Sequence, residues 1–419
     1  MALLFYNIFL SFYAVGIRIA AFTNNKAKAW LEGRKNLFHD LMIWRARYDA
    51  EAKIVWMHCA SLGEFEQGRP VIERIKTAHP DHIILITFFS PSGYLVRKNY
   101  TGADGVFYLP PDGHRSAQNF IEIVRPSLVI WIKYEYWYYY LTLLKQKQIP
   151  VILISAIFRK EQPFFKPYGG IWKKMAGSFR QIFVQDEASL SLLRNYSVND
   201  NAIVAGDTRF DRVLELAKLS DSLPEKLNYF CKGNKVLVAG STWPEDEEIL
   251  AGYAKMHSHI KFIVAPHEIS KEKLKATQTL FANAVFYSDF LKEDNMAQVL
   301  IIDNIGLLSK LYALADAAYI GGGFNKSGIH NILEAAVFGK PVVFGGEYQK
   351  FQEAKDLVAF GGAFSVKTAA ELCETFDKLF NDEHFSGRTG EICKQYVLEK
   401  KGATDIIIEY LQANRLLTI

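Results

Sequence analysis

The sequence has 419 residues, of which half are hydrophobic and 22% are charged, and its formal net charge is +4. A chain of this length ordinarily needs more than one hydrophobic core, so two domains are expected, and the ordinary composition argues against intrinsic disorder. The mildly basic balance suggests anionic partners without singling out nucleic acid. Four scattered cysteines without a CxxC pair indicate neither a disulfide framework nor a zinc site, and reduced cytosolic thiols are expected.

The first 22 residues form an almost wholly apolar run that only Asn7, Ser11 and Arg18 interrupt. A bilayer span needs about 20 such residues. No basic residue precedes the run, as a signal peptide would require, and the basic residues that come after it predict that the next domain stays in the cytoplasm. We therefore expect residues 1–25 to be an uncleaved membrane anchor that either spans the bilayer or lies in its interface. An ordinary buried helix is the alternative.

Beyond residue 48, short β-branched apolar runs alternate with helical patterns. The runs expected to form strands of a first array are 54–58, 83–89, 106–110, 128–132, 151–156, 181–185 and 202–206. Those of a second array are 236–240, 261–266, 284–288, 299–303, 317–321 and 341–345. Helices are expected between them, including one over 134–147. This alternation predicts parallel sheets that helices cover on both faces.

The two arrays predict an α/β protein with two Rossmann-like domains that face each other across a cleft. The first domain is expected at 26–212, a hinge at 213–234 and the second domain at 235–400. A helix at 401–419 follows, and packing back onto the first domain is one possibility for it. Because ligands of open α/β sheets bind beyond the carboxyl ends of the strands, the chemistry is expected in the loops that follow the strands.

A first motif, HCASLGE at 58–64, directly follows an expected strand. Ser61 is a suitable cap for the next helix, Gly63 permits a tight turn, and Glu64 opens the helix at the edge where ligands bind. A carboxylate there can take a proton from a hydroxyl group, and the helix terminus favours its ionised form. The alternative is an acid of a capping box that only stabilises the helix.

Two further motifs follow strands of the second array. Ser241 or Thr242 can cap a helix that has Pro244 in its first turn, and backbone amides at such a helix start can hold a phosphate. The glycine spacing matches neither G-x-G-x-x-G nor a Walker loop, so dinucleotide and P-loop sites lack support. Pro266 and His267 end another strand, and His267 is a candidate phosphate or base contact, although a loop histidine is more often structural.

The most specific motif is GGGFNKSGIHNILEAA at 321–336. Three glycines after a strand let a ligand approach the backbone closely, and the polar loop is expected to enter a helix near Gly328 and to offer its amides to an anion. Glu334, about one and a half turns into that helix, can accept hydrogen bonds from two ribose hydroxyls. The candidate ligand contacts of this loop are Gly322, Gly323, Lys326, Gly328, Asn331 and Glu334.

Together these motifs resemble those of the Kdo (3-deoxy-D-manno-octulosonic acid) transferases, inverting glycosyltransferases of the GT-B fold. Further similar stretches are TFFSPSG at 87–93, YLPPD at 108–112 and GDTRFD at 206–211. The chain departs from the family where an E-x-E-x-W-P motif is usual: it keeps Glu135 and Trp137 but has Lys133 in place of the first acid. Ile329 stands where a second glycine is usual.

The resemblance implies transfer of Kdo from CMP-Kdo to the lipid A precursor (lipid IVA) in lipopolysaccharide synthesis, on the cytoplasmic face of the inner membrane. It implies that Glu64 is the catalytic base, and that neither a metal nor another cofactor nor nucleic acid is needed. The acceptor contacts that it implies are Ser61, Gly63, Thr87, Ser92 and Glu135. The donor contacts are Arg209, Ser241, Thr242, Pro266, His267, Gly322, Gly323, Lys326, Gly328, Asn331 and Glu334.

Three other functions remain open at this point. A GT-B transferase that uses a UDP- or GDP-sugar would share the donor half, and a nonhydrolysing sugar-nucleotide epimerase would share the architecture without needing a membrane anchor. A membrane scaffold without enzymatic activity would bind no nucleotide.

Overall fold

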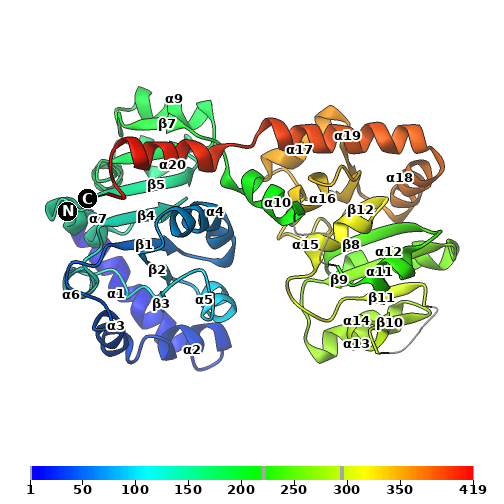
Figure 1. Cartoon of the computed structure of the whole chain (residues 1–419), viewed down its shortest axis with the longest axis horizontal. Coiled ribbons are helices and arrows are strands. Elements are labelled where there is room, and N and C mark those ends of the chain that lie inside the picture. Colours follow the sequence, from blue (N-terminus) through cyan, green and yellow to red (C-terminus); the bar gives the residue numbers. More distant parts are fainter. Residues whose placement is uncertain (1, 219–222, 293–296, 419) are drawn as a thin grey trace. The chain divides into compact units, whose positions relative to one another are not determined.

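The computed structural model describes residues 2–218, 223–292 and 297–418, which form two compact units (Figure 1). Unit 1 consists of Met1–Arg212 with Lys401–Ile419, and unit 2 of Val213–Lys400. The stretch 213–234, for which a hinge is expected, contains the end of α10 (Thr208–Lys218) and α11 (Glu225–Cys231).

Unit 1 is built around a sheet of seven parallel strands in the order β3-β2-β1-β4-β5-β6-β7. The strands are β1 (Ile54–Cys59), β2 (Ile83–Phe88), β3 (Gly105–Tyr108), β4 (Leu128–Ile132), β5 (Val151–Ala156), β6 (Gln181–Val184) and β7 (Ala202–Val204). Side chains of β1 alternate between two hydrophobic clusters: Trp56 enters one, and Val55 and Met57 enter the other. Helices therefore cover both faces of the sheet, as its continuous apolar strands predict.

Most helices of unit 1 alternate with the strands as expected, but the first ones precede β1 and the last lies in the C-terminal segment. They are α1 (Ala2–Ala20), α2 (Asn25–Glu32), α3 (Leu37–Arg45), α4 (Leu62–Ala78), α5 (Pro91–Arg97), α6 (His114–Val124), α7 (Tyr138–Gln146), α8 (Gly170–Ala176), α9 (Glu187–Asn195) and α20 (Ala403–Ala413), with a 3-10 turn at Pro163–Phe165. Among the described residues, α1 alone is long and apolar enough to cross a membrane.

Unit 2 contains a second parallel sheet, in the order β10-β11-β9-β8-β12-β13-β14. Its strands are β8 (Lys235–Thr242), β9 (Ile260–Pro266), β10 (Ala284–Phe286), β11 (Val299–Ile301), β12 (Ala317–Ile320), β13 (Val342–Gly345) and β14 (Ala363–Val366). Its other helices are α12 (Pro244–Met256), α13 (Lys271–Leu280), α14 (Tyr287–Phe290), α15 (Leu308–Leu311), α16 (Leu333–Ala336), α17 (Gln352–Phe360), α18 (Ala369–Asn381) and α19 (Glu383–Glu399), with a 3-10 turn at Tyr312–Leu314. The two Rossmann-like α/β units confirm the predicted fold class, whereas β14 was not predicted.

Each sheet has a place where the direction of its strand order reverses. In unit 1 it lies between β1 and β4, and in unit 2 between β8 and β12. Loops at such a switch point leave a crevice beyond the carboxyl ends of the strands, where ligands of this fold class bind. The motifs that begin after residues 59, 240 and 320 all lie at these two points.

The expectation of a helix over 134–147 is wrong in its first turn. Lys133 has a left-handed backbone (φ 62°), and α7 begins only at Tyr138. Asp112 fixes this start, because its carboxylate accepts the backbone N–H groups of Tyr139 and Tyr140 at 3.1 and 3.3 Å. Glu135 therefore lies in the loop at the carboxyl edge of the sheet.

Helix α20 packs on unit 1 against α4. Ile407 and Leu411 are fully buried in the same cluster as Ile72 and Ile75 of α4. The carboxylate of Asp211 accepts the N–H groups of Gly402 and Thr404 at 2.6 and 2.7 Å, so that it caps the start of α20 from a distant part of the sequence.

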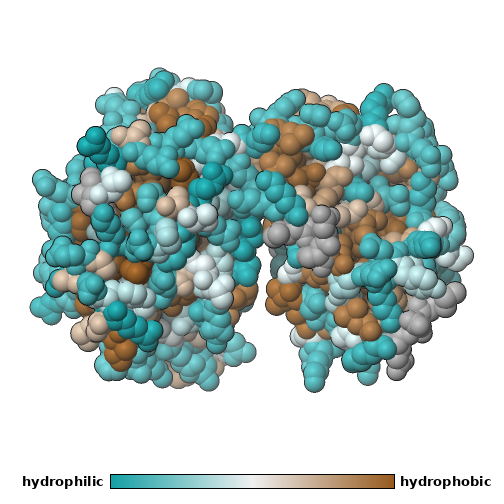
Figure 2. All heavy atoms as spheres, viewed as in Figure 1, coloured by the Kyte–Doolittle hydropathy of each residue, from teal (hydrophilic) through white to brown (hydrophobic). Residues whose placement is uncertain are grey.

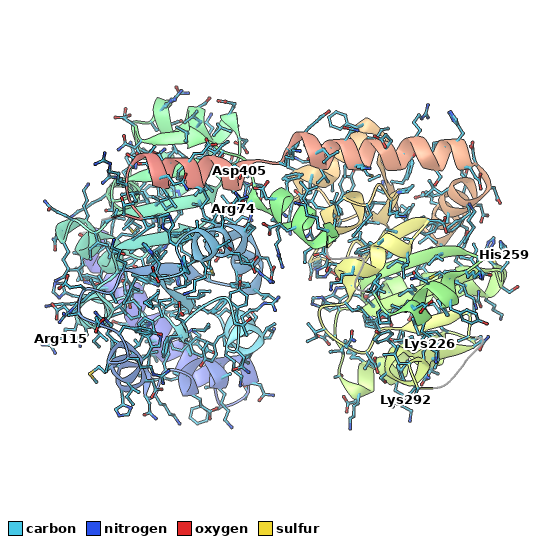
Figure 3. The ribbon with its side chains drawn as sticks, in the orientation of Figure 1. Arg74, Arg115, Lys226, His259, Lys292 and Asp405 are labelled. Atoms are coloured by element: carbon cyan, nitrogen blue, oxygen red, sulfur yellow. The ribbon has the colours of Figure 1, made fainter. Side chains whose placement is uncertain are left out.

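An exposed ion pair also joins these two helices. Arg74 on α4 and Asp405 on α20 point toward each other, and their side chains lie 3.1 Å apart (Figure 3). Both side chains are about half exposed, so the pair contributes little to stability.

We predict that Asp211→Ala lowers the free energy of unfolding by about 1–3 kcal/mol, because two backbone donors at the start of α20 lose their acceptor. The control Asp405→Ala, which removes only the exposed pair, should change it by about 0.5 kcal/mol or less. Urea unfolding of both variants measures the difference, and equal losses in the two variants would contradict the capping role of Asp211.

Candidate active site

Glu64 lies in the first turn of α4, directly beyond the end of β1. The helix is capped by Ser61, whose backbone is extended and whose hydroxyl oxygen accepts the N–H of Glu64 at 3.5 Å. The Glu64 carboxylate turns back and accepts the N–H of Ala60. Glu64 thus makes the contact of a capping acid. Its environment, however, is not that of a surface cap.

Burial raises the pKa of Glu64 to about 8, and the nearby negative charge of Glu135 adds to the increase. The hydrogen bond from Ala60 and the positive charge of Lys133 act in the opposite direction. The helix terminus was expected to favour the ionised form of this carboxyl, but the loss of hydration outweighs the helix dipole. A carboxylate with such a pKa is a stronger base than an exposed glutamate and still ionises near neutral pH.

Glu135 occupies the neighbouring loop, where its carboxylate accepts one side-chain hydrogen bond and lies near a buried histidine. The indole N–H of Trp137 donates to Oε2 at 2.7 Å. Nε2 of His58, a fully buried residue of β1, lies 3.5 Å from the same oxygen. The electrostatic effect of Glu135 on Glu64 shows that the loops after β1 and β4 bring two carboxyl groups to the switch point of unit 1.

Thr87 supports this arrangement from within the sheet. It is fully buried, and its hydroxyl oxygen lies 2.9 Å from Nδ1 of His58 and accepts the indole N–H of Trp56 at 2.8 Å. The expectation of a direct acceptor contact does not fit this burial. Thr87 instead orients His58, and the role of His58 beside Glu135 was missed by the sequence reasoning.

Two small residues mark the open side of the site. Gly63 is helical rather than part of a tight turn, and a Cβ atom there would meet no atom within 4 Å. The expectation that Gly63 permits a tight turn is therefore wrong. The helix would accept a larger residue at this position, and the space beside Gly63 is open. Ser92 is exposed at the start of α5, where its hydroxyl lies 3.0 Å from that of the capping residue Ser90.

Arg209 belongs to unit 1 and is held by an acid. Its Nε and Nη2 atoms each lie 2.8 Å from Oδ2 of Asp207, whose Oδ1 accepts the side-chain N–H of Gln67 at 3.0 Å. Burial of Asp207 opposes its ionisation, but the charge of Arg209 and its hydrogen bonds keep the pKa below the usual value. The Asp207–Arg209 pair is a fixed element at the edge of the unit 1 sheet, and the contact of Arg209 with the donor remains a prediction.

In unit 2, the turn from β8 to α12 is held by two buried carboxylates. Thr242 donates to Oε1 of Glu247 at 2.9 Å, so it does not cap α12, which has Trp243 at its N-cap position. Asp246 accepts the N–H of Trp243 and the N–H of Gly322, each at 2.8 Å. The amide of Gly322, for which an anion was expected, is thus occupied by a side chain of the protein. Ser241 has a left-handed backbone (φ 54°) in this turn.

The glycines after β12 serve the packing of the loop. A Cβ at Gly322 would lie 2.4 Å from the carbonyl oxygen of Gly328, and one at Gly323 would lie 2.5 Å from the backbone of Gly345 in β13. Gly322 and Gly328 also have positive φ angles of 96° and 81°. The packing of the loop therefore requires these glycines, because backbone of the same unit fills the space beside them, and the approach of a ligand to them remains a prediction.

The helix that was expected near Gly328 begins only at Leu333, as α16. Glu334 is consequently in its first turn, where the side chain of Asn331 donates to its Oε1 at 3.2 Å. The earlier amides of the loop are occupied: those of Gly328 and Ile329 donate to backbone carbonyls. Lys326 is exposed in the middle of the loop.

Three aromatic rings meet beyond the carboxyl ends of β8, β9 and β12. The rings of Trp243 and His267 are stacked with centroids 4.7 Å apart, and the ring of His330 is tilted against that of His267 with centroids 4.5 Å apart. The indole N–H of Trp243 donates to Nε2 of His330 at 3.3 Å. Burial, together with His267, lowers the pKa of His330 to about 4, so this ring is neutral at physiological pH.

The sequence reasoning quoted Trp243 and His330 inside motifs but gave neither a role. Their positions in the sequence could have indicated a role. Each follows a strand of the same parallel sheet, and the carboxyl ends of those strands meet at one edge of the sheet. His267 is exposed and Pro266 ends β9 just before it. The flat faces of this stack suit a base or a sugar ring.

Within 2–218, 223–292 and 297–418, the side chains of His, Cys, Asp and Glu form no group of three or more that could hold a metal ion. The absence of a metal requirement remains a prediction.

Comparison with known proteins shows which family this chain is similar to. The sequence profile described as 3-Deoxy-D-manno-octulosonic-acid transferase (kdotransferase) matches residues 35–212. A protein of Aquifex aeolicus (strain VF5) named 3-deoxy-D-manno-octulosonic acid transferase is 26% identical over 340 residues, which are 78% of this chain and 86% of that protein. One of the same name from Haemophilus influenzae (strain ATCC 51907 / DSM 11121 / KW20 / Rd) is 27% identical over 384 residues, 86% of this chain and 88% of that protein.

Among solved structures, UDP-GlcNAc 2-epimerase from Neisseria meningitidis bound to UDP-GlcNAc is similar with a TM-score of 0.61 and 19% identity. The match covers 86% of this chain and 100% of that one. At this identity the likeness concerns the fold alone. Residues 35–212 therefore match the 3-deoxy-D-manno-octulosonic acid transferase family, and over most of its length the chain is similar to proteins that carry that name.

Proposed function

We propose that this protein is an inverting glycosyltransferase that moves Kdo from CMP-Kdo to a hydroxyl group of the lipid A precursor, lipid IVA. The observation that carries the proposal is Glu64: a buried carboxyl group with a raised pKa, next to a second acid, at the switch point of unit 1 and inside the region that the family profile matches. The reaction would take place on the cytoplasmic face of the inner membrane, and α1 supports attachment there.

In the proposed reaction, Glu64 takes the proton of the acceptor hydroxyl as its oxygen attacks the anomeric carbon of Kdo. The new carbon–oxygen bond forms on the face opposite CMP, while the bond from that carbon to the phosphate oxygen breaks and CMP leaves with the electron pair. Bond breaking leads, so the sugar acquires oxocarbenium character, as in other glycosyl transfers. The open space above Gly63 supports an acceptor that approaches along the first turn of α4.

Unit 2 is proposed to hold the donor. The stacked rings of Trp243 and His267 offer a flat surface to the cytosine or ribose, and Glu334 remains the candidate acceptor of ribose hydroxyls. Lys326, exposed in the loop after β12, would attract the phosphate. On this proposal no metal ion takes part.

Replacing Glu64 tests the base. With CMP-Kdo and the lipid A precursor, the wild-type protein should give a product whose mass is increased by one or more Kdo residues. Glu64→Gln should lower its turnover by on the order of a hundredfold or more, because the proton of the attacking hydroxyl loses its acceptor. Mass spectrometry of the lipid fraction measures both, and near-normal turnover in a folded variant would contradict the assignment.

Thermal unfolding of the same variant supplies the control for folding. A carboxyl whose pKa is raised on folding loses stability as pH rises from its unfolded pKa through about 8. Glu64→Gln, which avoids this cost and keeps an acceptor for Ala60, should therefore be at least as stable as wild type at pH 9.

Glu135 is proposed to influence the pH at which Glu64 loses its proton and can act as the base. We predict that the rate of transfer by the wild-type protein rises with pH through about 8, as Glu64 loses its proton. Glu135→Gln removes a negative neighbour, so it lowers the pKa of Glu64 and shifts the rising limb to lower pH. The measurement is the pH profile of kcat/KM for both proteins. A limb at the same pH in both would show that Glu135 does not act on Glu64.

The donor site is tested by binding alone. Glu334→Gln should weaken the binding of CMP-Kdo about tenfold or more, because a charged acceptor of hydroxyl groups becomes neutral. Glu272→Gln, on the exposed first turn of α13, is the matched control and should bind as wild type does. Calorimetric titration measures both, and equal affinities would argue against Glu334.

Two rival activities give different results in these assays. A transferase for another nucleotide sugar would bind a UDP- or GDP-sugar rather than CMP-Kdo. An epimerase, whose fold this chain shares, would convert a nucleotide sugar in the absence of any acceptor.

A further inference from the structure

Helix α1 has two faces with different surroundings. Its docked face carries the residues that are partly buried against unit 1, and these recur along the helix at the period of an α-helix: Tyr6, Asn7, Leu10, Ala14, Ile17 and Ala20. The opposite face carries a stripe of large apolar side chains. Phe5, Phe12 and Ile19, spaced seven residues apart, are 66%, 73% and 65% exposed.

The docked face is held by polar contacts with Asp112, Tyr138 and Tyr139, and we call this binding site of α1 on unit 1 the seat. Tyr6 donates its hydroxyl to Oδ2 of Asp112 at 2.6 Å, and its oxygen accepts the backbone N–H of Tyr138 at 3.3 Å. Asn7 accepts the hydroxyl of Tyr139 at 2.7 Å. Asp112 is buried, and its carboxylate also anchors the start of α7. Hydrogen bonds of this kind fix the helix against the body of the unit.

The seat lies at the edge of the sheet that carries the candidate site. Tyr13 of α1 stacks on Phe89, with ring centroids 6.1 Å apart, and Phe89 packs against Trp137 at 4.8 Å. Trp137 is the residue that donates to Glu135. Because Phe89 and Trp137 follow β2 and β4, α1 runs along the carboxyl edge, beside the two acids.

A helix in this seat cannot cross a bilayer without cost. Its contacts extend from Tyr6 in the second turn to Ala20 at the end, so a crossing orientation would carry the polar edge of unit 1 into the hydrocarbon. Leaving the seat instead would deprive buried Asp112 of the Tyr6 hydroxyl. Both alternatives leave polar groups without water or hydrogen-bond partners, whereas an orientation in the plane of the membrane leaves the seat intact.

The exposed stripe and the charges around it fit a lipid surface. Arg18, Lys26 and Lys28 are exposed, and no acidic residue precedes Glu32. Such cations near an anionic membrane are attracted to its surface. Most of the face of unit 1 that Figure 2 shows is hydrophilic, so a run of exposed apolar side chains like that of α1 is not a general property of its surface.

We propose that α1 lies in the plane of an anionic phospholipid surface, with its apolar stripe in the interface and its other face in the seat on unit 1. This inference deepens the proposed function, on whose membrane-bound acceptor it rests. It implies that the sheet edge with Glu64 and Glu135 lies against the lipid head groups. An acceptor can then present its sugar hydroxyl while its acyl chains stay in the bilayer.

Depth measurements on the full-length protein test the orientation. Spin labels are attached to Phe5→Cys, Phe12→Cys and Ile19→Cys, each in a background in which Ser replaces the two partly exposed cysteines, Cys231 and Cys373. The proteins are bound to vesicles of phosphatidylethanolamine and phosphatidylglycerol, and collision with oxygen and with a nickel chelate gives the depth of each label. Tyr229→Cys, at an exposed site of unit 2, is the control that should stay in water.

We expect the three labels to share one shallow depth, about 5–10 Å below the head groups. A helix that spans the bilayer would separate the labels at Phe5 and Ile19 by about 21 Å along the membrane normal, which would overturn the proposal. Labels that stay out of the lipid in a protein that sediments as a dimer would also overturn it, because a second copy would then cover the stripe.

These measurements need no CMP-Kdo. A protein with all labels at one shallow depth but without transferase activity would contradict the proposed function and leave the orientation of α1 in place. An active protein with labels at spanning depths would do the reverse.

Discussion

Unit 1 places two carboxyl groups, those of Glu64 and Glu135, where the strand order of its sheet reverses. Burial removes water from Glu64, and Glu135 adds an unfavourable charge, so that the pKa of Glu64 rises to about 8. The surrounding residues limit this cost without removing it: Ala60 donates a hydrogen bond to Glu64, Trp137 donates one to Glu135, and Lys133 supplies a positive charge. The unfavourable energy is what makes Glu64 a base, because a fully neutralised carboxylate would have little affinity for a proton.

The fold by itself does not specify this chemistry. A UDP-GlcNAc 2-epimerase, which by its name is not a transferase, shares the architecture at 19% identity. The features that separate the two functions are local. They are the acidic pair after β1 and β4, in the part of the chain that the family profile matches, and α1, which runs along the same edge. The proposed base and the proposed membrane contact are therefore connected through the ring contacts of Phe89 and Trp137.

The strands were predictable from sequence because buried parallel strands are continuous apolar runs, and Val55 to Met57 shows the pattern. Strand β14 was missed because AFSV is short and only half buried. The position of Glu64 followed from its place after β1, but its pKa did not, since burial and the distant Glu135 depend on tertiary structure. The glycine motif after β12 was recognised in the sequence, but its role in packing was not. A Cβ atom at Gly323 would clash with the backbone of β13. Asp112, Asp211 and Asp246 act on backbone groups far away in the sequence, which no local pattern reveals.

The central claim is that Glu64 carries a proton near neutral pH in the folded protein, and its titration tests this directly. The protein is labelled with carbon-13 at the side-chain carboxyl of glutamate, and the Glu64 resonance is identified by its absence in Glu64→Gln. The chemical shift is then followed with pH by nuclear magnetic resonance. The account predicts a midpoint near pH 8. A midpoint near 4.5, the ordinary value for an exposed glutamate, would contradict it and would leave Glu64 as an acid that only caps its helix.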